Sequence, residues 1–297
     1  MGVTPPGSPP GAGRLVLVAT PIGNLGDLAP RAAEILASAD VIACEDTRRT
    51  GLLLTRQGIA RRRLIVVNEH TETERVPEIL ALLAEGRTVA LVSDAGSPGV
   101  SDPGQRLVAA ALDAGFVVTG VPGPSAAVLA LTISGLATAR WVFEGFVPRK
   151  GPARRERLAQ IATEARTVVL YEAPHRLART LTDLAALCGD ERPVVIAREL
   201  TKLHEELWRG TLGQAAARVA AAEPVGEHVI VLAGAPPDDA PDEATIDEAL
   251  EQRLAAGMTV RDAADAVAGE LGAPRRLVYA RALEARSRTR TTSVDPT

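Results

Sequence analysis

Short apolar segments rich in β-branched residues recur between residues 14 and 121, and amphipathic segments separate them. The apolar segments are 15–19, 41–44, 64–67, 89–92 and 117–121, and the helical patterns fall near 30–37, 47–57, 76–85 and 105–114. Near-continuous apolar strands that alternate with helices are typical of a parallel sheet covered by helices on both faces. This pattern therefore predicts an α/β domain over residues 14–122.

A second alternating region follows a Pro-Gly-Pro turn at 122–124 and a helical segment at 125–134. Strand patterns occupy 141–146, 168–171, 194–197, 206–209 and 229–233, and helical patterns occupy 153–164, 176–187 and 212–221. They predict a second α/β domain over residues 123–235, but they leave the direction of its strands open. We thus expect an α/β protein of two domains.

The remaining segments are expected to be two tails, a linker and a small helical region. Residues 1–13 are rich in Pro and Gly and are expected to be a disordered tail and not a signal peptide, and 289–297 a second tail. Pro and Asp dominate the predicted linker, 236–245, and three short helices are expected in 246–288. The last two of them could form a helix-turn-helix-like hairpin that docks on nucleic acid, but a helical lid or a dimerisation element is the favoured interpretation.

Composition and charge indicate the kind of partner and the cellular environment that suit this chain. The net charge of −4 argues against affinity for nucleic acid over the whole surface, although arginines cluster in 48–63, 149–157 and 275–290. The two cysteines, Cys44 and Cys188, lie among apolar neighbours and form no Cys-x-x-Cys motif, which fits a reducing cytoplasm. No apolar run approaches the roughly 20 residues that a membrane helix needs, so no membrane association is expected.

The loops directly after the strands of the first domain are the candidate ligand sites, because ligands of parallel sheets bind outside the carboxyl ends of the strands. The loop at 93–104 contains three glycines, two prolines and two aspartates, which is far more than a chain reversal requires. The loop at 121–127 enters a helix whose first N–H groups suit a carboxylate or another anion. Neither a Gly-x-Gly-x-x-Gly nor a Gly-x-x-x-x-Gly-Lys motif occurs, so no dinucleotide fingerprint or P-loop is expected.

Six ordered segments resemble one family closely. They read ATPIGNLGD, ACEDTRRTGLLL, VSDAGSPGVSDPG, VPGPSA, LYEAPHRL and ARELTKLHEE, in that order. They are similar to successive motifs of the ribosomal RNA small-subunit methyltransferase I family, which belongs to the tetrapyrrole-methylase fold class. The likeness runs from about residue 15 to residue 233 and more loosely beyond. It implies methylation of the 2'-oxygen of cytidine 1402 in 16S ribosomal RNA of the small subunit.

The resemblance also implies a cofactor, S-adenosyl-L-methionine, in a cleft between the two α/β domains, and a homodimer. The residues carried over to the cofactor site are Asp94, Ala95, Gly96, Ser97, Ser125, Ala126, Tyr171, Glu172 and Ile230, the last within the run 229–231. The first loop, 20–24, departs from the Gly-rich loop of the tetrapyrrole enzymes, and this departure puts a tetrapyrrole substrate in doubt.

Methyl transfer from a sulfonium needs no metal, because the methyl group is already activated and most of the catalysis can be positioning. A ribose hydroxyl is a weak nucleophile, so a base or a charge near it would help. The candidates are Glu45, Asp46, Glu199 and Lys202, and spacing does not choose among them. For Lys202 to act as a neutral base, burial would have to lower its pKa.

For the RNA, the predicted contacts are Arg48, Arg49 and Arg149 on phosphates, because Arg matches phosphate geometry, and His70 near the substrate. The four histidines show no metal-ligand spacing. Two other functions stay open: a methylase of the same fold that acts on a tetrapyrrole or a protein, and a non-catalytic RNA-binding factor of ribosome assembly. Intact loops at 94–97 and 125 disfavour the last of these.

Overall fold

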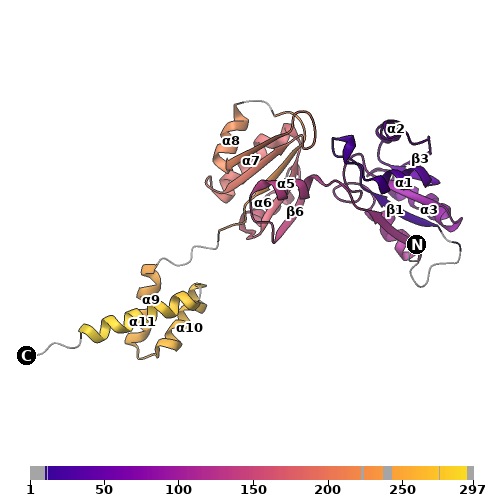
Figure 1. The fold of residues 1–297 in the computed structure, drawn as a ribbon. Helices are drawn as coiled ribbons and strands as arrows, with labels where there is room; N and C mark the ends of the chain where they lie inside the picture. The colour runs from indigo at the N-terminus through magenta and orange to yellow at the C-terminus, as the bar shows by residue number, and fades with distance from the viewer. Residues whose placement is uncertain (1–10, 12, 222–223, 237–242, 274, 293–297) are drawn as a thin grey trace, which may run out of the picture. The chain divides into compact units, whose positions relative to one another are not determined.

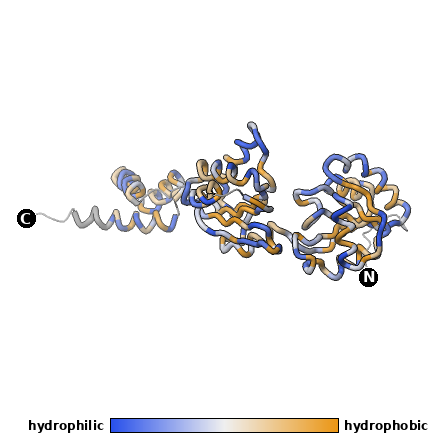
Figure 2. The backbone as a smooth tube through the Cα atoms, turned by 90° about the horizontal axis from the view of Figure 1, so that it is seen from above, coloured by the Kyte–Doolittle hydropathy of each residue, from blue (hydrophilic) through white to orange (hydrophobic). Residues whose placement is uncertain are grey.

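The computed structural model describes residues 11, 13–221, 224–236, 243–273 and 275–292, which form two units that divide after Gly234 (Figure 1). Of the segments predicted to be tails or linker, residues 1–10, 12, 237–242 and 293–297 lie outside the described residues. Apolar segments form the strands of each sheet, and hydrophilic segments gather in the surrounding helices and loops (Figure 2).

The first sheet is parallel throughout, in the order β3-β2-β4-β1-β5. Its strands are β1 Arg14–Val18, β2 Val41–Cys44, β3 Arg63–Val66, β4 Thr88–Val92 and β5 Val117–Val121. Because every strand runs the same way, the loops after all five strands lie at one edge of the sheet. The predicted parallel sheet is confirmed.

Helices cover both faces of this sheet. One face packs on α1 Pro30–Ser38 and α2 Thr47–Arg56, and the other packs on α3 Glu72–Ala84 and α4 Gln105–Asp113. A short 3-10 helix, Leu25–Asp27, interrupts the loop after β1. The sequence predicts the start of α3 near Val76, before Pro77, but the helix begins at Glu72 and Pro77 lies inside it.

Glu72, in the first turn of α3, fixes the start of α4. Its side chain is buried, and its carboxylate accepts hydrogen bonds from the N–H groups of Gly104 (3.1 Å) and Leu107 (3.0 Å). The first N–H groups of a helix have no partner inside that helix. The Glu72 carboxylate is the acceptor for these groups at the start of α4, and it thereby holds the carboxyl end of the loop at 93–104 in place.

The second sheet is mixed, in the order β6-β7-β10-β8-β9. Its strands are β6 Trp141–Phe146, β7 Thr167–Glu172, β8 Pro193–Arg198, β9 Glu206–Thr211 and β10 His228–Leu232. β6 and β7 are parallel, whereas β10 is antiparallel to both β7 and β8, and β9 is antiparallel to β8. The carboxyl ends of β6, β7 and β8 therefore share one edge with the amino end of β10.

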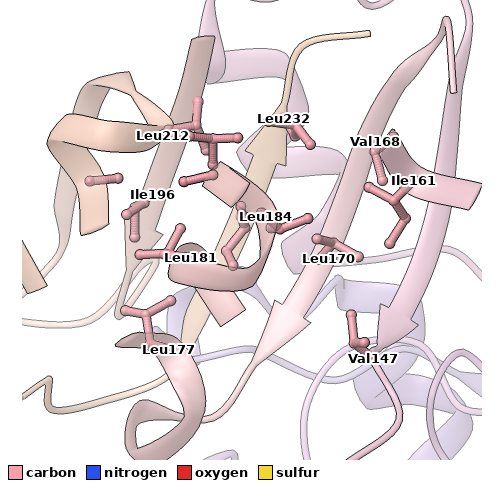
Figure 3. Packing of buried hydrophobic residues seen from close by; sticks show 14 of the residues in the cluster. Val147, Ile161, Val168, Leu170, Leu177, Leu181, Leu184, Ile196, Leu212 and Leu232 are labelled. Atoms are coloured by element: carbon pink, nitrogen blue, oxygen red, sulfur yellow. The ribbon is translucent and has the colours of Figure 1, made fainter. Parts of the chain in front are cut away.

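The two faces of this sheet are covered unequally. The helices α6 Pro152–Thr163, α7 Pro174–Cys188 and α8 Leu212–Ala220 pack on one face, where Leu170, Leu181 and Leu184 lie in the apolar core (Figure 3). The other face packs on α5 Ala126–Ser134 and on Ile22, which comes from the loop after β1. The first domain thus contributes to the core of the second.

The second unit is a group of three helices, α9 Glu243–Ala255, α10 Val260–Leu271 and α11 Arg275–Thr292. They enclose their own apolar core, and an Arg281–Asp247 ion pair (2.6 Å) ties α11 to α9. α9 begins inside the range predicted as linker, and α11 continues past residue 288. None of the helices among the described residues is long and apolar enough to cross a membrane.

We expect Glu72→Ala to lower the free energy of unfolding by about 2–4 kcal/mol, because two buried N–H groups lose their acceptor. Urea unfolding followed by circular dichroism would measure this change. The control is Glu74→Ala on the exposed side of the same helix, which should stay within about 0.5 kcal/mol of the wild type. Equal effects of the two substitutions would contradict the role assigned to Glu72.

Candidate functional site

The edges of the two sheets enclose a cavity of about 300 Å³, here named the small-residue cavity. From the first domain it is lined by Ile22, Ala95, Gly96, Ser97, Val100, Ser101 and Asp102. From the rest of the same unit it is lined by Ser125, Ala126, Phe146, Tyr171, Glu172, Ala173, Pro174, Ala197, Leu200, Glu227, His228 and Val229. The loops predicted to bind the cofactor, at 95–97 and 125–126, therefore face the same space.

The loop after β1 joins the two walls of this cavity. Thr20 and Gly96 exchange two backbone hydrogen bonds, of 2.9 and 3.0 Å, and Ile22 packs into the apolar face of the second sheet. The Asn24 N–H donates to the Thr201 hydroxyl (3.1 Å). A Cβ at Gly23 would lie 2.4 Å from Lys202 Cγ, so only glycine allows this approach.

Aromatic rings and the start of α5 form the opposite side. Ser125 is the N-cap of α5, where its hydroxyl accepts from the Val128 N–H, and the Tyr171 hydroxyl accepts from the Ala127 N–H (3.2 Å). Phe143 and Phe146 contact the Tyr171 ring edge-on, with centroids 4.9 and 5.6 Å away. Burial raises the pKa of Tyr171, which therefore stays neutral and holds α5 against the sheet.

Two residues predicted for the cofactor site differ from the others. Glu172 lines the cavity, but its side chain is buried: the carboxylate accepts from the Thr180 hydroxyl (2.6 Å) and pairs with Arg176 (3.1 Å). Ile230 is fully buried in the core under α6, α7 and α8, whereas its neighbours His228 and Val229 line the cavity. Burial, followed by Arg198, lowers the pKa of His228.

A second hollow of about 420 Å³, here named the side chamber, adjoins the small-residue cavity, with which it shares Ile22, Ala95 and Glu227. Its other lining residues include Thr20, Pro21, Gly23, Arg49, Arg56, Ser93, Asp94 and Lys202. The side chamber thus contains three basic side chains, Arg49, Arg56 and Lys202, among carboxylates and apolar residues, whereas His228 is the basic residue of the small-residue cavity.

Asp94, predicted to contact the cofactor, lines the side chamber and not the small-residue cavity. Its carboxylate accepts from the Asp46 N–H (3.1 Å) and lies 3.5 Å from the Arg49 guanidinium. Burial raises the pKa of Asp94, against the opposing effect of Arg49. Asp94 therefore lies beside the point where the two hollows meet.

The four predicted catalytic residues fall into two groups. Glu45 and Asp46 lie close to Asp94, and Glu199 and Lys202 pair with each other (3.0 Å) at the far wall of the side chamber. Burial, reinforced by Asp94, raises the pKa of Glu45, whereas hydrogen bonds from Arg48 lower the pKa of Asp46 to about 2.

Lys202 is held as a cation. Burial alone would lower its pKa, but hydrogen bonds to Glu227 (2.7 Å) and Glu199 (3.0 Å) outweigh burial and raise it. The backbone N–H of Glu227, together with Lys202, lowers the pKa of Glu199. A neutral Lys202 would require a lowered pKa, whereas Glu227, a carboxylate distant in the sequence, and Glu199 raise it.

The predicted RNA contacts differ in position. Arg49 lines the side chamber, while Arg48 is 89% exposed and pairs with Asp46. Arg149 is exposed after β6, and His70 is exposed on a turn after β3, an edge strand of the first sheet. Among the described residues, no group of three or more His, Cys, Asp or Glu side chains is arranged to hold a metal ion.

Asp102 is the residue that the sequence reasoning missed. It lines the small-residue cavity, and burial, followed by the nearby Glu45 carboxylate, raises its pKa to about 6. A signal existed, because Asp102 is the second aspartate of the loop at 93–104. Phe146 and His228 were missed for another reason: the sequence did not predict which strand ends of the second sheet share an edge.

Comparisons with known proteins agree with this geometry. The family model described as Tetrapyrrole (Corrin/Porphyrin) Methylases matches residues 14–216, and one described as RsmI C-terminal HTH domain matches residues 240–286. Proteins named ribosomal RNA small subunit methyltransferase I are similar over most of their length. That of Synechocystis is 50% identical over 92% of this chain and 98% of its own, and that of Escherichia coli O157:H7 is 43% identical over 92% and 95%.

Solved structures share the fold at lower identity. A uroporphyrin-III C-methyltransferase of Thermus thermophilus, complexed with S-adenyl homocysteine, superposes with a TM-score of 0.55 at 20% identity and covers 74% of this chain and 97% of its own. The methyltransferase CobJ superposes with a TM-score of 0.58 at 22% identity, over 75% and 95%. These likenesses show that the two sheets form the tetrapyrrole-methylase fold.

Substituting Gly23 with alanine should push the loop after β1 away from Lys202, and lower the free energy of unfolding by about 1–3 kcal/mol. Thermal unfolding of the purified variant would measure this. The matched control is Gly51→Ala inside α2, where an added Cβ meets nothing within 4 Å and should stabilise by up to about 1 kcal/mol. A Gly23→Ala protein as stable as the wild type would show that the contact is loose.

Proposed function

The chain belongs to the tetrapyrrole methylase family and, within it, to the ribosomal RNA small subunit methyltransferase I proteins, and from this premise we propose that it methylates the 2'-oxygen of the cytidine 1402 ribose in 16S ribosomal RNA. It is a methyltransferase of ribosomal RNA. The methyl donor in this proposal is S-adenosyl-L-methionine, and no metal takes part.

The observation that carries the proposal is that two different hollows meet at Ile22, Ala95 and Glu227. Direct displacement requires the methyl carbon to lie in line between the donor sulfur and the attacking oxygen. The small-residue cavity, with its apolar wall and its helix N-terminus, suits the cofactor. The side chamber, with Arg49, Arg56 and Lys202, suits a ribose and its phosphates.

We propose that a carboxylate in the group around Asp94 accepts the proton of the ribose hydroxyl. Among the four predicted candidates, Glu45 is the one whose pKa is raised by burial, and Asp94 next to it has a raised pKa as well. A base works best when its pKa approaches the working pH. Asp46 and Glu199 are poorer bases because their pKa values are lowered, and Lys202 serves as a positive charge.

The RNA contacts proposed are Arg48, Arg49 and Arg149 on phosphates and His70 near the substrate. Phosphate contacts position an RNA without reading its sequence. The helical unit matches a family model that is described as an HTH domain, which favours RNA docking over a lid, and it has its own apolar core. We further propose that the protein works as a homodimer in the cytoplasm and acts on the small ribosomal subunit.

The two alternatives are less favoured. A tetrapyrrole or protein substrate would not explain relatives at 43–50% identity that are all named as ribosomal RNA methyltransferases. A non-catalytic assembly factor would not require the donor cavity to be kept open.

Mass-spectrometric mapping of ribosomal RNA tests the proposal. Purified protein, S-adenosyl-L-methionine and small subunits from cells that lack the enzyme should yield one added methyl group on the ribose of cytidine 1402. Methylation of a tetrapyrrole precursor alone would contradict the RNA substrate. A protein that binds no cofactor in calorimetry would favour the assembly factor.

Glu45→Gln should reduce the turnover of methyl transfer at least tenfold and leave the cofactor affinity within about threefold, because the amide cannot accept the proton. Transfer of labelled methyl groups to small subunits measures turnover, and calorimetry with S-adenosylhomocysteine measures affinity. Glu74→Gln, on the exposed side of α3, is the control. Unchanged turnover in Glu45→Gln would move the role of base to Asp94.

Removal of residues 237–297 should abolish methylation of small subunits but keep the cofactor affinity, because the two units have separate cores. Gel filtration and calorimetry would verify that the shortened protein folds and binds the cofactor. Full activity of the shortened protein on small subunits would contradict a docking role for the helical unit.

A further inference from the structure

Three carboxylates line the small-residue cavity: Asp102, Glu172 and Glu227. Two of them are occupied elsewhere. Glu172 is bound by Thr180 and Arg176, and Glu227 pairs with Lys202 (2.7 Å) while 71% of its side chain is exposed. Asp102 makes no ion pair with any residue that the structure describes. The cavity therefore presents one carboxylate without a positively charged partner.

Backbone hydrogen bonds tie together the loop around Asp102, and Ser101 and Asp102 both line the cavity. Within the loop, the Gly99 N–H donates to the Pro103 carbonyl (3.1 Å), and the Val100 N–H donates to the Ser97 carbonyl (3.3 Å). Ser101, the preceding residue, has a φ of 62°, a left-handed conformation that costs energy in a residue other than glycine. Such strain persists only where the surrounding structure enforces it, and it gathers at ligand sites.

Two other elements fix this loop from outside. Glu72 anchors its end at Gly104, as described above. On the other side, a Cβ at Gly145, beside the irregularity in β6, would lie 3.0 Å from the Ser101 hydroxyl. The second sheet thus leaves room for Ser101, and Asp102 is held at the cavity before any ligand arrives.

The charges near Asp102 are of one sign. Glu45 and Asp94 are close enough to raise the pKa of Asp102, and the nearby Ser93 hydroxyl opposes this rise. A site with excess negative charge favours a cation. The start of α5 lines the same cavity at Ser125 and Ala126, and the amino end of a helix favours a negative group. One cavity thus offers a place for each charge of an amino-acid zwitterion.

We propose that Asp102 binds the α-ammonium group at the methionine end of the cofactor. This inference rests on the proposed function, which supplies the cofactor, and it deepens that function by assigning one of its contacts. Asp102 acts as a binding and orienting residue, because fixing the amino-acid end fixes the sulfur to which the methyl group is attached. A charge-assisted hydrogen bond to an ammonium is one of the stronger contacts that a carboxylate makes.

A ligand pair tests this assignment. One ligand is S-adenosylhomocysteine, and the other is its deaminated analogue, which keeps the thioether and the carboxylate but lacks the α-amine. Calorimetry at pH 7.5 would compare the wild type, Asp102→Asn, and Asp113→Asn at the exposed end of α4 as a control. The wild type and the control should prefer the amine-bearing ligand by about tenfold or more. Asp102→Asn should lose that preference and bind the analogue as the wild type does.

Two results would overturn the role of Asp102. If Asp102→Asn weakens both ligands equally, the residue supports the loop only, and if it weakens neither, the ammonium binds elsewhere. A wild-type protein that binds neither ligand would overturn the proposed function, and the role of Asp102 with it. If the wild type and Asp102→Asn bind S-adenosylhomocysteine with the same affinity, the proposed function stands and only the role of Asp102 is overturned.

The pH dependence separates Asp102 from its neighbours. The pKa of Asp102 is raised to about 6, so the free carboxyl gains a proton below that pH and loses its attraction for the ammonium. Affinity for S-adenosylhomocysteine should therefore fall between pH 7 and 5 in the wild type and stay flatter in Asp102→Asn. Glu45, Asp94, Tyr171, His228, Glu172 and Glu227 are the other titratable groups near the cavity, and both proteins contain all of them. Identical slopes in the two proteins would overturn the assignment.

Discussion

The pairing of Thr20 with Gly96 and the packing of Ile22 under α5 are the contacts on which the site depends. They join the loop after β1 to the loop after β4 on one side and to the second sheet on the other. Gly23 permits the close approach to Lys202, and Asn24 adds a hydrogen bond to Thr201. Through Ile22, this loop contributes to the walls of both hollows.

The site is built by loops that two different sheets present at matching edges. In the first sheet, parallel strands bring the small-residue loops together. In the second, the antiparallel β10 places its beginning, at His228 and Val229, beside the ends of β7 and β8. The hollows differ in character because the Gly- and Ala-rich loop faces one of them, and Arg49, Arg56 and Lys202 face the other. Donor and acceptor can thus approach one point from separate sides.

Much of the fold could be predicted because apolar periodicity reports burial directly. Every strand and main helix was predicted near its observed place, since strands buried on both faces, such as β2 and β4, are continuous apolar runs. Because these runs are apolar at every position, they do not show which face of the sheet each side chain occupies. All five residues of β10 are buried, so the sequence could not tell Ile230, in the core, from Val229, at the cavity.

The chemistry of single residues was harder to predict, because it depends on partners distant in sequence. The charge of Lys202 depends on Glu227, and the direction of Asp94 depends on the Asp46 N–H and on Arg49. Asp94 and Asp102 lie in one loop, eight residues apart, yet they face different hollows. The motifs predicted that this loop lines the site, but they could not predict which hollow each of its two aspartates faces.

A crystal structure of the complex with S-adenosylhomocysteine tests the central claim most directly. The account predicts that the ligand fills the small-residue cavity, with its sulfur near Ala95 and Ile22 and the side chamber open to the methyl position. A ligand bound in the side chamber, or a small-residue cavity that stays closed in the complex, would contradict it.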